Sequence, residues 1–466
     1  MKLLYAEYQH HLDQLIQAAL NGSDPAECVK KRLSRRDDRI MIGDLEFDVS
    51  QGRVFLIGIG KASVAMGKAV AEILAGDLHA SILITKNTGK EWGPELSDSP
   101  LLLRGSSFTL FESGHPIPDS ESVNSASAVE QLLADATESD LVICLISGGA
   151  SALFSQPLIP LSDWQMLNQA LLKSGCTINE LNHIRQRLDR VKGGGLAKMA
   201  APAVCVSLIL SDVVGNRLET IGSGPTVHCQ FRDSDAMVIL EKYGLPQQLP
   251  EETWNHIQAA MLQPIEDDPV EYSTPYNLIV GDVRSAANAS LIRAAQLGFV
   301  TQLLTTHLQG EAREVGTVTA AIAKDLQPGR CLILGGETTV IVKGTGRGGR
   351  NQELALAAAL GIDGMSNVLI ASFATDGEDG IADAAGAVAT GETIARSRAF
   401  GLDAQAFLAN NDSYTFFSRL DEQDTAADGT AAQIQSPPHL IRTGSTGTNV
   451  NDLIFILKYP SPGSQR

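Results

Sequence analysis

The chain has 466 residues, of which 44% are hydrophobic and 5% aromatic, and it contains 43 glycines. This composition is typical of an α/β protein of two or three domains built from small and aliphatic side chains. The formal net charge of -18 argues against nucleic acid or an anionic membrane as a partner. No apolar run reaches the ~20 residues that span a bilayer, and the six cysteines lack C-x-x-C spacing. We therefore expect a cytoplasmic protein with reduced core cysteines.

The first predicted elements are an amphipathic helix over residues 3–20 and a buried strand over residues 53–59. Gly58 and Gly60 suggest a dinucleotide-binding turn, but the next predicted strand ends in Thr-Lys, where an acid would hold a ribose. The turn leads to Lys61 at the start of a helix. There an ammonium group can meet a ligand at the carboxyl edge of the sheet, and the alternative is an exposed lysine of the first helical turn.

A further strand, residues 140–146, is apolar after Asp140, which indicates a parallel sheet with helices on both faces. It ends in a Ser-Gly-Gly-Ala-Ser loop that offers free N-H groups and hydroxyls, so we predict a phosphate-binding loop. The loop lacks the second glycine of a hydrolase nucleophile elbow, which argues against a nucleophilic Ser151. The loop residues that we expect to contact a phosphate are Ser147, Gly148, Gly149 and Ser151.

Two further features precede the middle of the chain. Arg185 and Lys192 belong to a basic cluster that ends in three glycines, which could hold an anion in so acidic a chain or form an ordinary helix face. Asp212 follows a predicted strand over residues 203–210 and is a candidate magnesium ligand or base. Five prolines then punctuate residues 244–275.

These prolines predict a connection over residues 244–275 between two α/β domains. The expected domains are a Rossmann-like one over residues 1–243 and a second over residues 276–466.

The most informative stretch of the second half is residues 331–354. Two short apolar runs, 332–334 and 338–342, predict two strands that meet at a glycine bend beside Glu337. A glycine-rich loop then leads to Arg350 and Asn351 at the start of a strong helix-forming sequence. Freed N-H groups, a helix N-terminus and arginines would bind an anion. The alternative is a mobile surface loop with solvated arginines.

A carboxylate pair follows the next predicted strand, residues 368–374. Asp376 and Asp379 lie between glycines, where they could hold a metal or form an ordinary acidic turn.

Several motifs, in the same order along the chain, resemble those of the glycerate 2-kinase family, whose C-terminal domain is of the MOFRL type. They are GGETTV with GRGGRNQE, GHPIPD, SGGASAL, KGGGLA, SDVVGN, GSGPT, TDGEDG and GSTGTN. One departure is Ser445, where the family usually has proline. His115 lies in one of these motifs, and we assign it no catalytic role.

This resemblance implies two α/β domains with mostly parallel sheets flanked by helices and an active site in the cleft between them. It implies ATP-dependent phosphorylation of D-glycerate on its 2-hydroxyl, with ATP and Mg²⁺ as cofactors, and leaves a homodimer open. We expect catalytic roles for Lys61, Arg350 and Asp212, substrate or phosphate contacts from Ser147, Gly148, Gly149, Ser151, Arg185, Lys192, Glu337 and Asn351, and metal binding by Asp212, Asp376 and Asp379. The alternatives are an NAD(P)H-dependent hydroxypyruvate reductase and a non-catalytic ligand-binding protein.

Overall fold

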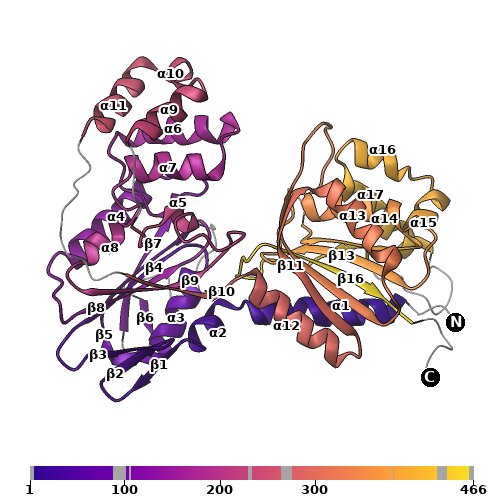
Figure 1. The fold of residues 1–466 in the computed structure, drawn as a ribbon, viewed down its shortest axis with the longest axis horizontal. Helices are drawn as coiled ribbons and strands as arrows, with labels where there is room; N and C mark the ends of the chain where they lie inside the picture. Colours follow the sequence, from indigo (N-terminus) through magenta and orange to yellow (C-terminus); the bar gives the residue numbers. More distant parts are fainter. Residues whose placement is uncertain are drawn as a thin grey trace. The chain divides into compact units, whose positions relative to one another are not determined.

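The computed structural model of the chain folds into two compact units (Figure 1). One unit is the continuous stretch Pro25–Val280, whereas the other combines Met1–Asp24 with Gly281–Arg466. The predicted domains, 1–243 and 276–466, therefore differ from these units, because the first helix belongs with the C-terminal part of the chain. None of the described helices is long and apolar enough to cross a membrane. The structure describes residues 5–87, 101–103, 106–228, 233–263, 275–380, 383–427 and 438–460.

The Pro25–Val280 unit is built on a seven-stranded sheet in the order β10-β9-β8-β4-β5-β7-β6. The five strands from β9 to β7 pair in parallel, as the apolar runs predict, so their carboxyl ends share one edge of the sheet. A smaller sheet, β1-β2-β3, lies in the same unit. The strands are β1 (Leu33–Arg36), β2 (Arg39–Ile42), β3 (Leu45–Asp48), β4 (Val54–Ile59), β5 (Leu78–Lys86), β6 (Leu101–Leu103), β7 (Ser106–Ser113), β8 (Leu141–Ile146), β9 (Val204–Leu210) and β10 (Tyr276–Gly281).

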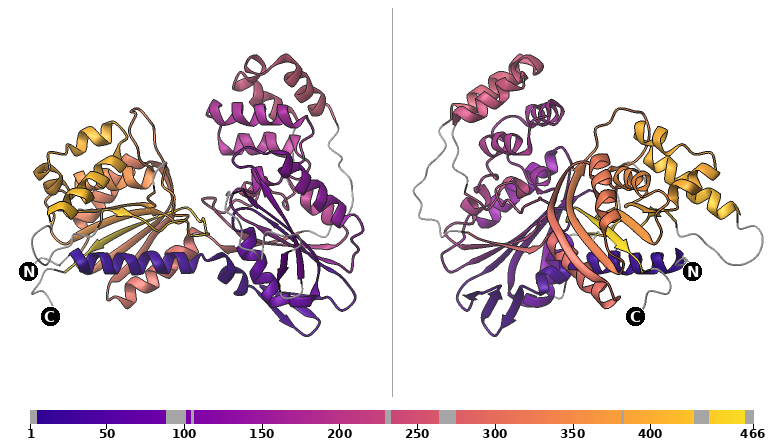
Figure 2. Two further views of the ribbon diagram at one scale, coloured as in Figure 1. Left: turned by 180° about the vertical axis from the view of Figure 1, so that it is seen from behind. Right: turned by 45° about the vertical axis from the view of Figure 1, so that its right-hand side comes forward.

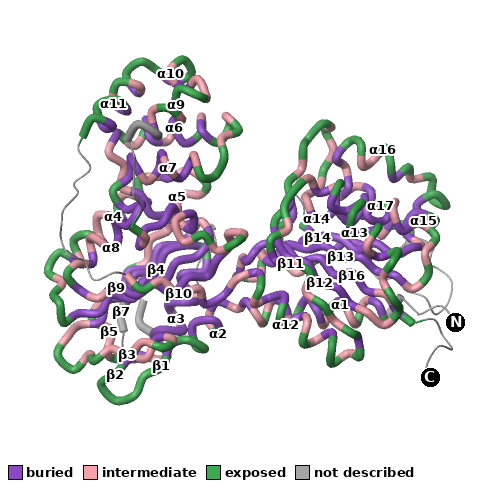
Figure 3. The backbone as a smooth tube through the Cα atoms, viewed as in Figure 1, coloured by how far each residue is buried: buried purple, intermediate pink, exposed green. Residues whose placement is uncertain are grey.

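Helices cover both faces of this sheet, and Figure 3 shows β4 buried along its length. Helix α3 packs on β4 and β5, where Gly67 faces Leu83. Helices α4 and α8 pack on the opposite face, in a core with Phe55 and Ile57. The helices near the sheet are α2 (Pro25–Lys30), α3 (Ser63–Leu74), α4 (Ser120–Leu133), α5 (Ala150–Leu153) and α8 (Gly195–Ala200), with 3-10 turns η1 (Ala75–Asp77) and η2 (Ile221–Ser223).

A separate helical layer in this unit has its own core, to which Trp164, Ile184, Leu240 and Ile257 contribute. The prediction that residues 244–275 are a domain connection is therefore wrong for the helices α10 and α11, which pack in this layer. The remainder of that stretch lies largely outside the described residues. The layer comprises α6 (Leu161–Ser174), α7 (Ile178–Leu188), α9 (Asp233–Lys242), α10 (Leu245–Gln248) and α11 (Glu251–Met261).

The second unit is built on a six-stranded sheet in the order β11-β12-β16-β13-β14-β15. Only β11 and β12 pair in parallel, and the other four pairs are antiparallel. The expectation of a mostly parallel sheet is wrong here, because β16, from the end of the chain, inserts between β12 and β13. The strands are β11 (Val300–Glu311), β12 (Arg330–Thr339), β13 (Val368–Ala374), β14 (Gly386–Thr390), β15 (Leu440–Ile441) and β16 (Asp452–Lys458).

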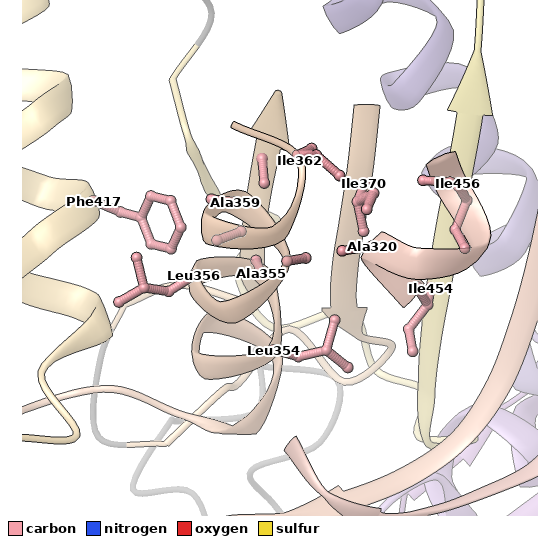
Figure 4. Packing of buried hydrophobic residues seen from close by; sticks show 14 of the residues in the cluster. Ala320, Leu354, Ala355, Leu356, Ala359, Ile362, Ile370, Phe417, Ile454 and Ile456 are labelled. Atoms are coloured by element: carbon pink, nitrogen blue, oxygen red, sulfur yellow. The ribbon is translucent and has the colours of Figure 1, made fainter. Parts of the chain in front are cut away.

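Helices α1 and α12 cover one face of this sheet, and the other helices of the unit cover the opposite face (Figures 1 and 2). Helix α14 is buried on all sides, with Phe417 on one side and Ile370 and Ile456 of the strands on the other (Figure 4). Its alanines suit both the helical conformation and this close packing. The helices are α1 (Tyr5–Gly22), α12 (Val283–Gln296), α13 (Ala312–Asp325), α14 (Arg350–Gly361), α15 (Thr393–Ala399), α16 (Ala404–Ala409) and α17 (Ser413–Ala427).

The two short strands predicted around Glu337 are wrong, because β12 is one strand that runs through Gly335 and Gly336. Gly336 has φ of 153°, and a Cβ atom there would lie 2.1 Å from the carbonyl oxygen of Leu308 in β11. The pairing of β11 with β12 is irregular just before this point. The extra residues lie in β11, where Thr305 to Leu308 oppose Leu334 to Gly336, so a bulge in β11 replaces the predicted bend.

Asp140, directly before β8, is a buried carboxylate whose hydrogen-bond partners stabilise the fold. It is 3% exposed and accepts hydrogen bonds from Arg53 Nη2 (2.8 Å) and Thr137 N (2.8 Å). Burial alone would raise the pKa of Asp140, but these hydrogen bonds hold it well below its usual range. We expect Arg53→Ala to cost about 3 kcal/mol of unfolding free energy, since a buried carboxylate loses its partner.

Urea unfolding at pH 7 measures this effect. Arg39→Ala is the control, because its pair with Glu46 is exposed and should contribute little to stability. The Asp140 contribution is fully present above its unfolded pKa and is lost as the pH falls through the lower folded pKa. Equal effects of the two substitutions would contradict this assignment.

Candidate active site

The loops after β4 and β8 are hydrogen-bonded to each other at the carboxyl edge of the first unit's sheet. Lys61 N donates to Gly148 O (2.9 Å), and Ala62 N donates to Ser147 Oγ (3.1 Å). Ser147 N in turn donates to Ile59 O (2.9 Å). Ser147 is buried, so this hydroxyl fixes the loop that presents Lys61. The Lys61 side chain is exposed and has no hydrogen-bond or ion-pair partner among the described residues.

The two loop glycines allow other strand ends to approach. Gly149 has φ of 89°, and a Cβ atom there would lie 3.2 Å from His115 Cδ2 and 3.4 Å from Lys61 Cγ. A Cβ atom on Gly148 would lie 2.2 Å from Asp212 Oδ2. The structure thus brings Lys61, the loop and Asp212 to one edge, as their positions after parallel strands predict, and adds His115 from the loop after β7.

Arg185 lies on α7 and is 8% exposed. Its Nε donates to Asn168 Oδ1 (2.9 Å), and Asn168 is fixed by its own bond to Trp164 O (2.9 Å). Neither terminal amino group of Arg185 has a hydrogen-bond partner within the described part of the chain. Burial lowers the pKa of Arg185 to about 10, which leaves it charged at neutral pH. A buried guanidinium with two unused donor groups is suited to an incoming carboxylate or phosphate.

Two other predicted contacts have internal roles. Lys192 is 3% exposed and donates to Ala150 O (3.3 Å) and to Phe154 O, so its ammonium binds the carbonyls of the α5 segment. Burial lowers the pKa of Lys192 to about 8. Ser151 Oγ and Ser223 Oγ share a hydrogen bond of 2.9 Å. Both residues therefore connect parts of the structure beneath the edge rather than extending from it.

In the second unit, Arg350 begins α14 and forms a two-pronged ion pair with Asp452 at the start of β16. The distances are 2.5 Å from Nε to Oδ2 and 2.9 Å from Nη2 to Oδ1. Burial would lower the pKa of Arg350, but Asp452 raises it above its usual value. Glu337 Oε1 lies 3.4 Å from Arg350 Nη1. The guanidinium is thus held in one orientation with about a third of its side chain exposed.

Asp379 caps the same helix and is 2% exposed. Its Oδ1 accepts from Asn351 N (3.1 Å) and Nδ2 (3.3 Å), and its Oδ2 accepts from Gln352 N (2.9 Å) and Nε2 (3.0 Å). Four donors saturate the carboxylate, which argues against the predicted metal role of Asp379. Asn351 is likewise turned inward, since its Oδ1 accepts from Ser372 Oγ (2.5 Å). The helix N-terminus predicted to bind an external anion is occupied by this internal one.

The glycine-rich loop before α14 packs against residues 410–413 instead of offering free N-H groups. Cβ atoms on Gly344, Gly346 and Gly348 would each lie within 2.3 Å of atoms in that segment. This packing argues against the predicted anion site over residues 343–347, because the backbone donors there already have acceptors. Lys343 N and Gly344 N donate to Asn411 Oδ1, Thr345 N to Asn410 Oδ1, Gly346 N to Asn410 O, and Arg347 N to Asp412 Oδ1.

The remaining metal candidates are Asp212 and Asp376, both half-buried at strand ends. Asp376 Oδ1 accepts from Glu378 N (3.0 Å), which leaves acceptor positions on its carboxylate. Within the described residues, no group of three histidine, cysteine or acidic side chains could hold a metal. Mg²⁺ usually takes only one or two carboxylates, with water and phosphate oxygens completing its shell. Single carboxylates such as these fit that pattern.

Sequence reasoning missed His115, Lys86 and Asp452 as contributors to these edges. Lys86 is the last residue of β5 and His115 follows β7, so their positions at the ends of apolar runs were the available signal. The partner of Arg350 could not be found this way, because Asp452 is 102 residues away along the chain.

Models of two protein families match this chain: a domain of unknown function (DUF4147) over residues 11–258 and the MOFRL family over residues 330–452. The chain is 39% identical over 412 residues to a D-glycerate 2-kinase from Thermotoga maritima, covering 86% of this chain and 90% of the relative. It is 35% identical over 455 residues to a glycerate 2-kinase from Pyrococcus horikoshii, covering 95% and 96%. A crystal structure of a glycerate kinase from Thermotoga maritima superposes with a TM-score of 0.79 at 35% identity, covering 97% and 100%.

The fold and these strand ends define an α/β protein of two domains, with basic side chains gathered at one edge of its parallel sheet. Its relatives match along nearly the whole chain, and both family models match in the expected order. The chain therefore belongs to the glycerate kinase family with a DUF4147 N-terminal and a MOFRL C-terminal domain. The resemblance inferred from the sequence motifs is confirmed.

Asp379→Asn separates a helix cap from a metal ligand. The new side-chain amide would place its own N-H group against the N-H groups of Asn351 or Gln352 that now donate to the carboxylate. We therefore expect a loss of about 2 kcal/mol in unfolding free energy. Asp376→Asn, the control, should change stability by less than about 0.5 kcal/mol. Thermal and urea unfolding measure both, and an Asp379→Asn protein of native stability would contradict the capping role.

The pH dependence provides a second readout for Asp379. Burial raises its pKa to about 6 despite the hydrogen bonds from Asn351 and Gln352. The folded state then binds a proton more tightly than the unfolded state, so the contribution of this group to stability falls as the pH rises from about 4 to above 6. This slope should be absent from Asp379→Asn.

Proposed function

We propose that the protein transfers the γ-phosphoryl group of ATP to the 2-hydroxyl of D-glycerate, which gives 2-phosphoglycerate and ADP. The observation that supports this most directly is the 39% identity, over most of both chains, to a relative named D-glycerate 2-kinase. The cationic edge formed by Lys61 and Arg185 fits substrates that are all anions. It also explains how a chain of net charge -18 could attract them, since positive charge is concentrated locally.

Phosphoryl transfer depends mainly on positioning and on neutralising charge, which require fixed cations rather than a nucleophilic side chain. Lys61, exposed at the end of β4, would contact the transferring phosphoryl group. Arg350, held by Asp452, would supply a second fixed donor. Arg185 would bind a carboxylate or phosphate through its unused amino groups.

Magnesium would be held by Asp212 or Asp376, where it neutralises phosphate charge when bound. Asp212 also stays a candidate base. Internal hydrogen bonds give Lys192, Ser151, Asn351 and Asp379 positioning roles in this proposal. The active site in a cleft between the domains, expected from the resemblance, stays a prediction.

The product identifies the reaction. We expect incubation with ATP, Mg²⁺ and D-glycerate to give a phosphorus NMR signal of 2-phosphoglycerate together with ADP. Replacing D-glycerate with L-glycerate tests which enantiomer the enzyme accepts. Excess chelator should abolish turnover, since the charge on the ATP phosphates is then no longer neutralised by Mg²⁺. A signal of 3-phosphoglycerate would contradict transfer to the 2-hydroxyl. Oxidation of NAD(P)H by hydroxypyruvate, without ATP-dependent turnover, would favour the reductase alternative.

Lys61→Ala tests the role of the exposed ammonium. Its ammonium group has no hydrogen-bond or ion-pair partner among the described residues, so we expect native stability and a loss of about 100-fold in kcat, the usual effect of removing one donor from developing charge. Lys68→Ala, further along α3, is the matched control and should keep full activity. A Lys61→Ala enzyme with normal kcat and a raised KM for glycerate would show that Lys61 binds the ground-state substrate instead.

A further inference from the structure

His115 lies in a group of basic side chains at the carboxyl edge of the parallel sheet. It follows β7, and its ring packs over Gly149 beside the stem of Lys61. Neither ring nitrogen has a hydrogen-bond partner among the residues that the structure describes. The imidazole is therefore half-buried beside an exposed lysine, with both nitrogens uncommitted within the described residues.

The charged groups that act on His115 come from three different elements. They are Lys61 after β4, Lys86 at the end of β5 and Arg185 on α7. The loop after β8 contributes no titratable side chain, Asp212 faces Gly148, and Asp119 in the loop of His115 caps α4 through Ser122 N (3.0 Å). Burial, followed by the three cations, lowers the pKa of His115 to about 4. The imidazole is therefore neutral at physiological pH and has a free lone pair.

Anionic substrates would change this environment. The carboxylate of a hydroxy acid and the phosphates of a nucleotide would bind to the three cations and neutralise them. The same imidazole then becomes a better proton acceptor, because the charges that disfavour its cationic form are compensated. Proton acceptance would thus require that the substrates be bound.

We propose that His115 is a catalytic residue that accepts the proton of the acceptor hydroxyl during phosphoryl transfer. This inference rests on the proposed function. The hydroxyl O-H bond breaks and its proton goes to a ring nitrogen of His115, while the oxygen forms a bond to the γ-phosphorus. The bond from that phosphorus to the bridging oxygen breaks, and its electron pair leaves with ADP. His115 returns the proton to water when the anionic products depart.

The kinetic test compares His115→Asn and His115→Gln with the natural protein. We expect a loss of about 100-fold in kcat, with the KM for ATP changed by less than about twofold and a native melting temperature. His256→Gln, on α11 and paired with Asp163, is the control and should keep full activity. A His115 variant that folds and keeps kcat within about threefold overturns the inference, whereas a natural protein that does not phosphorylate glycerate overturns the proposed function instead.

A proton-binding measurement distinguishes catalysis from a packing role. The ring protons of His115 are assigned in NMR spectra by their loss in His115→Gln, and their titration is followed with and without D-glycerate plus a non-hydrolysable ATP analogue. We expect a pKa below about 5 in the free protein and a rise of at least about one unit on binding. A pKa near the ordinary 6.5, or one unchanged by the ligands, overturns the inference.

Discussion

Parallel pairing of five strands is the constraint on which the candidate site depends. Because β4, β5, β7, β8 and β9 point the same way, the residues that follow them are brought to one edge of the sheet whatever their separation along the chain. Lys61, His115 and Asp212 are more than 150 residues apart at the extremes, yet all lie around one two-glycine loop. Neither face of such a sheet is available to a ligand, since helices cover both, so a ligand would approach at the strand ends.

The second unit positions Arg350 by an ion pair with a buried carboxylate. Its sheet is mostly antiparallel, and the N-terminus of its central helix is neutralised internally by Asp379. What faces outward is the Arg350 guanidinium, fixed by a buried carboxylate on the strand inserted from the C-terminus. Such a pair costs desolvation energy, but it keeps a cation in one orientation, which is what stabilisation of developing charge requires.

Much of the Pro25–Val280 unit could be predicted from the sequence. Its apolar runs indicate the parallel strands, and the residues after these runs indicate what lies at the carboxyl edge of the sheet. Arg185 and Lys192 show the limit of this reasoning: both belong to one basic cluster, but one has unused donors and the other binds carbonyl oxygens. Composition cannot separate these cases, since the difference lies in which acceptors happen to be within reach. The glycine-rich loop before α14 shows the same limit. Its glycines indicate close approach, but the approaching partner is the segment 410–413 and not a phosphate.

The order of the two units along the chain has a consequence for how the protein is made. The Pro25–Val280 unit is continuous, so all of its residues have been synthesised while much of the chain is still to be translated. Helix α1, in contrast, packs on α12, and the sheet beneath them is completed only by β16. During translation α12, on which this helix packs, is synthesised more than 250 residues after it. The N-terminal segment is thus made first but belongs to the unit whose remaining residues are made last.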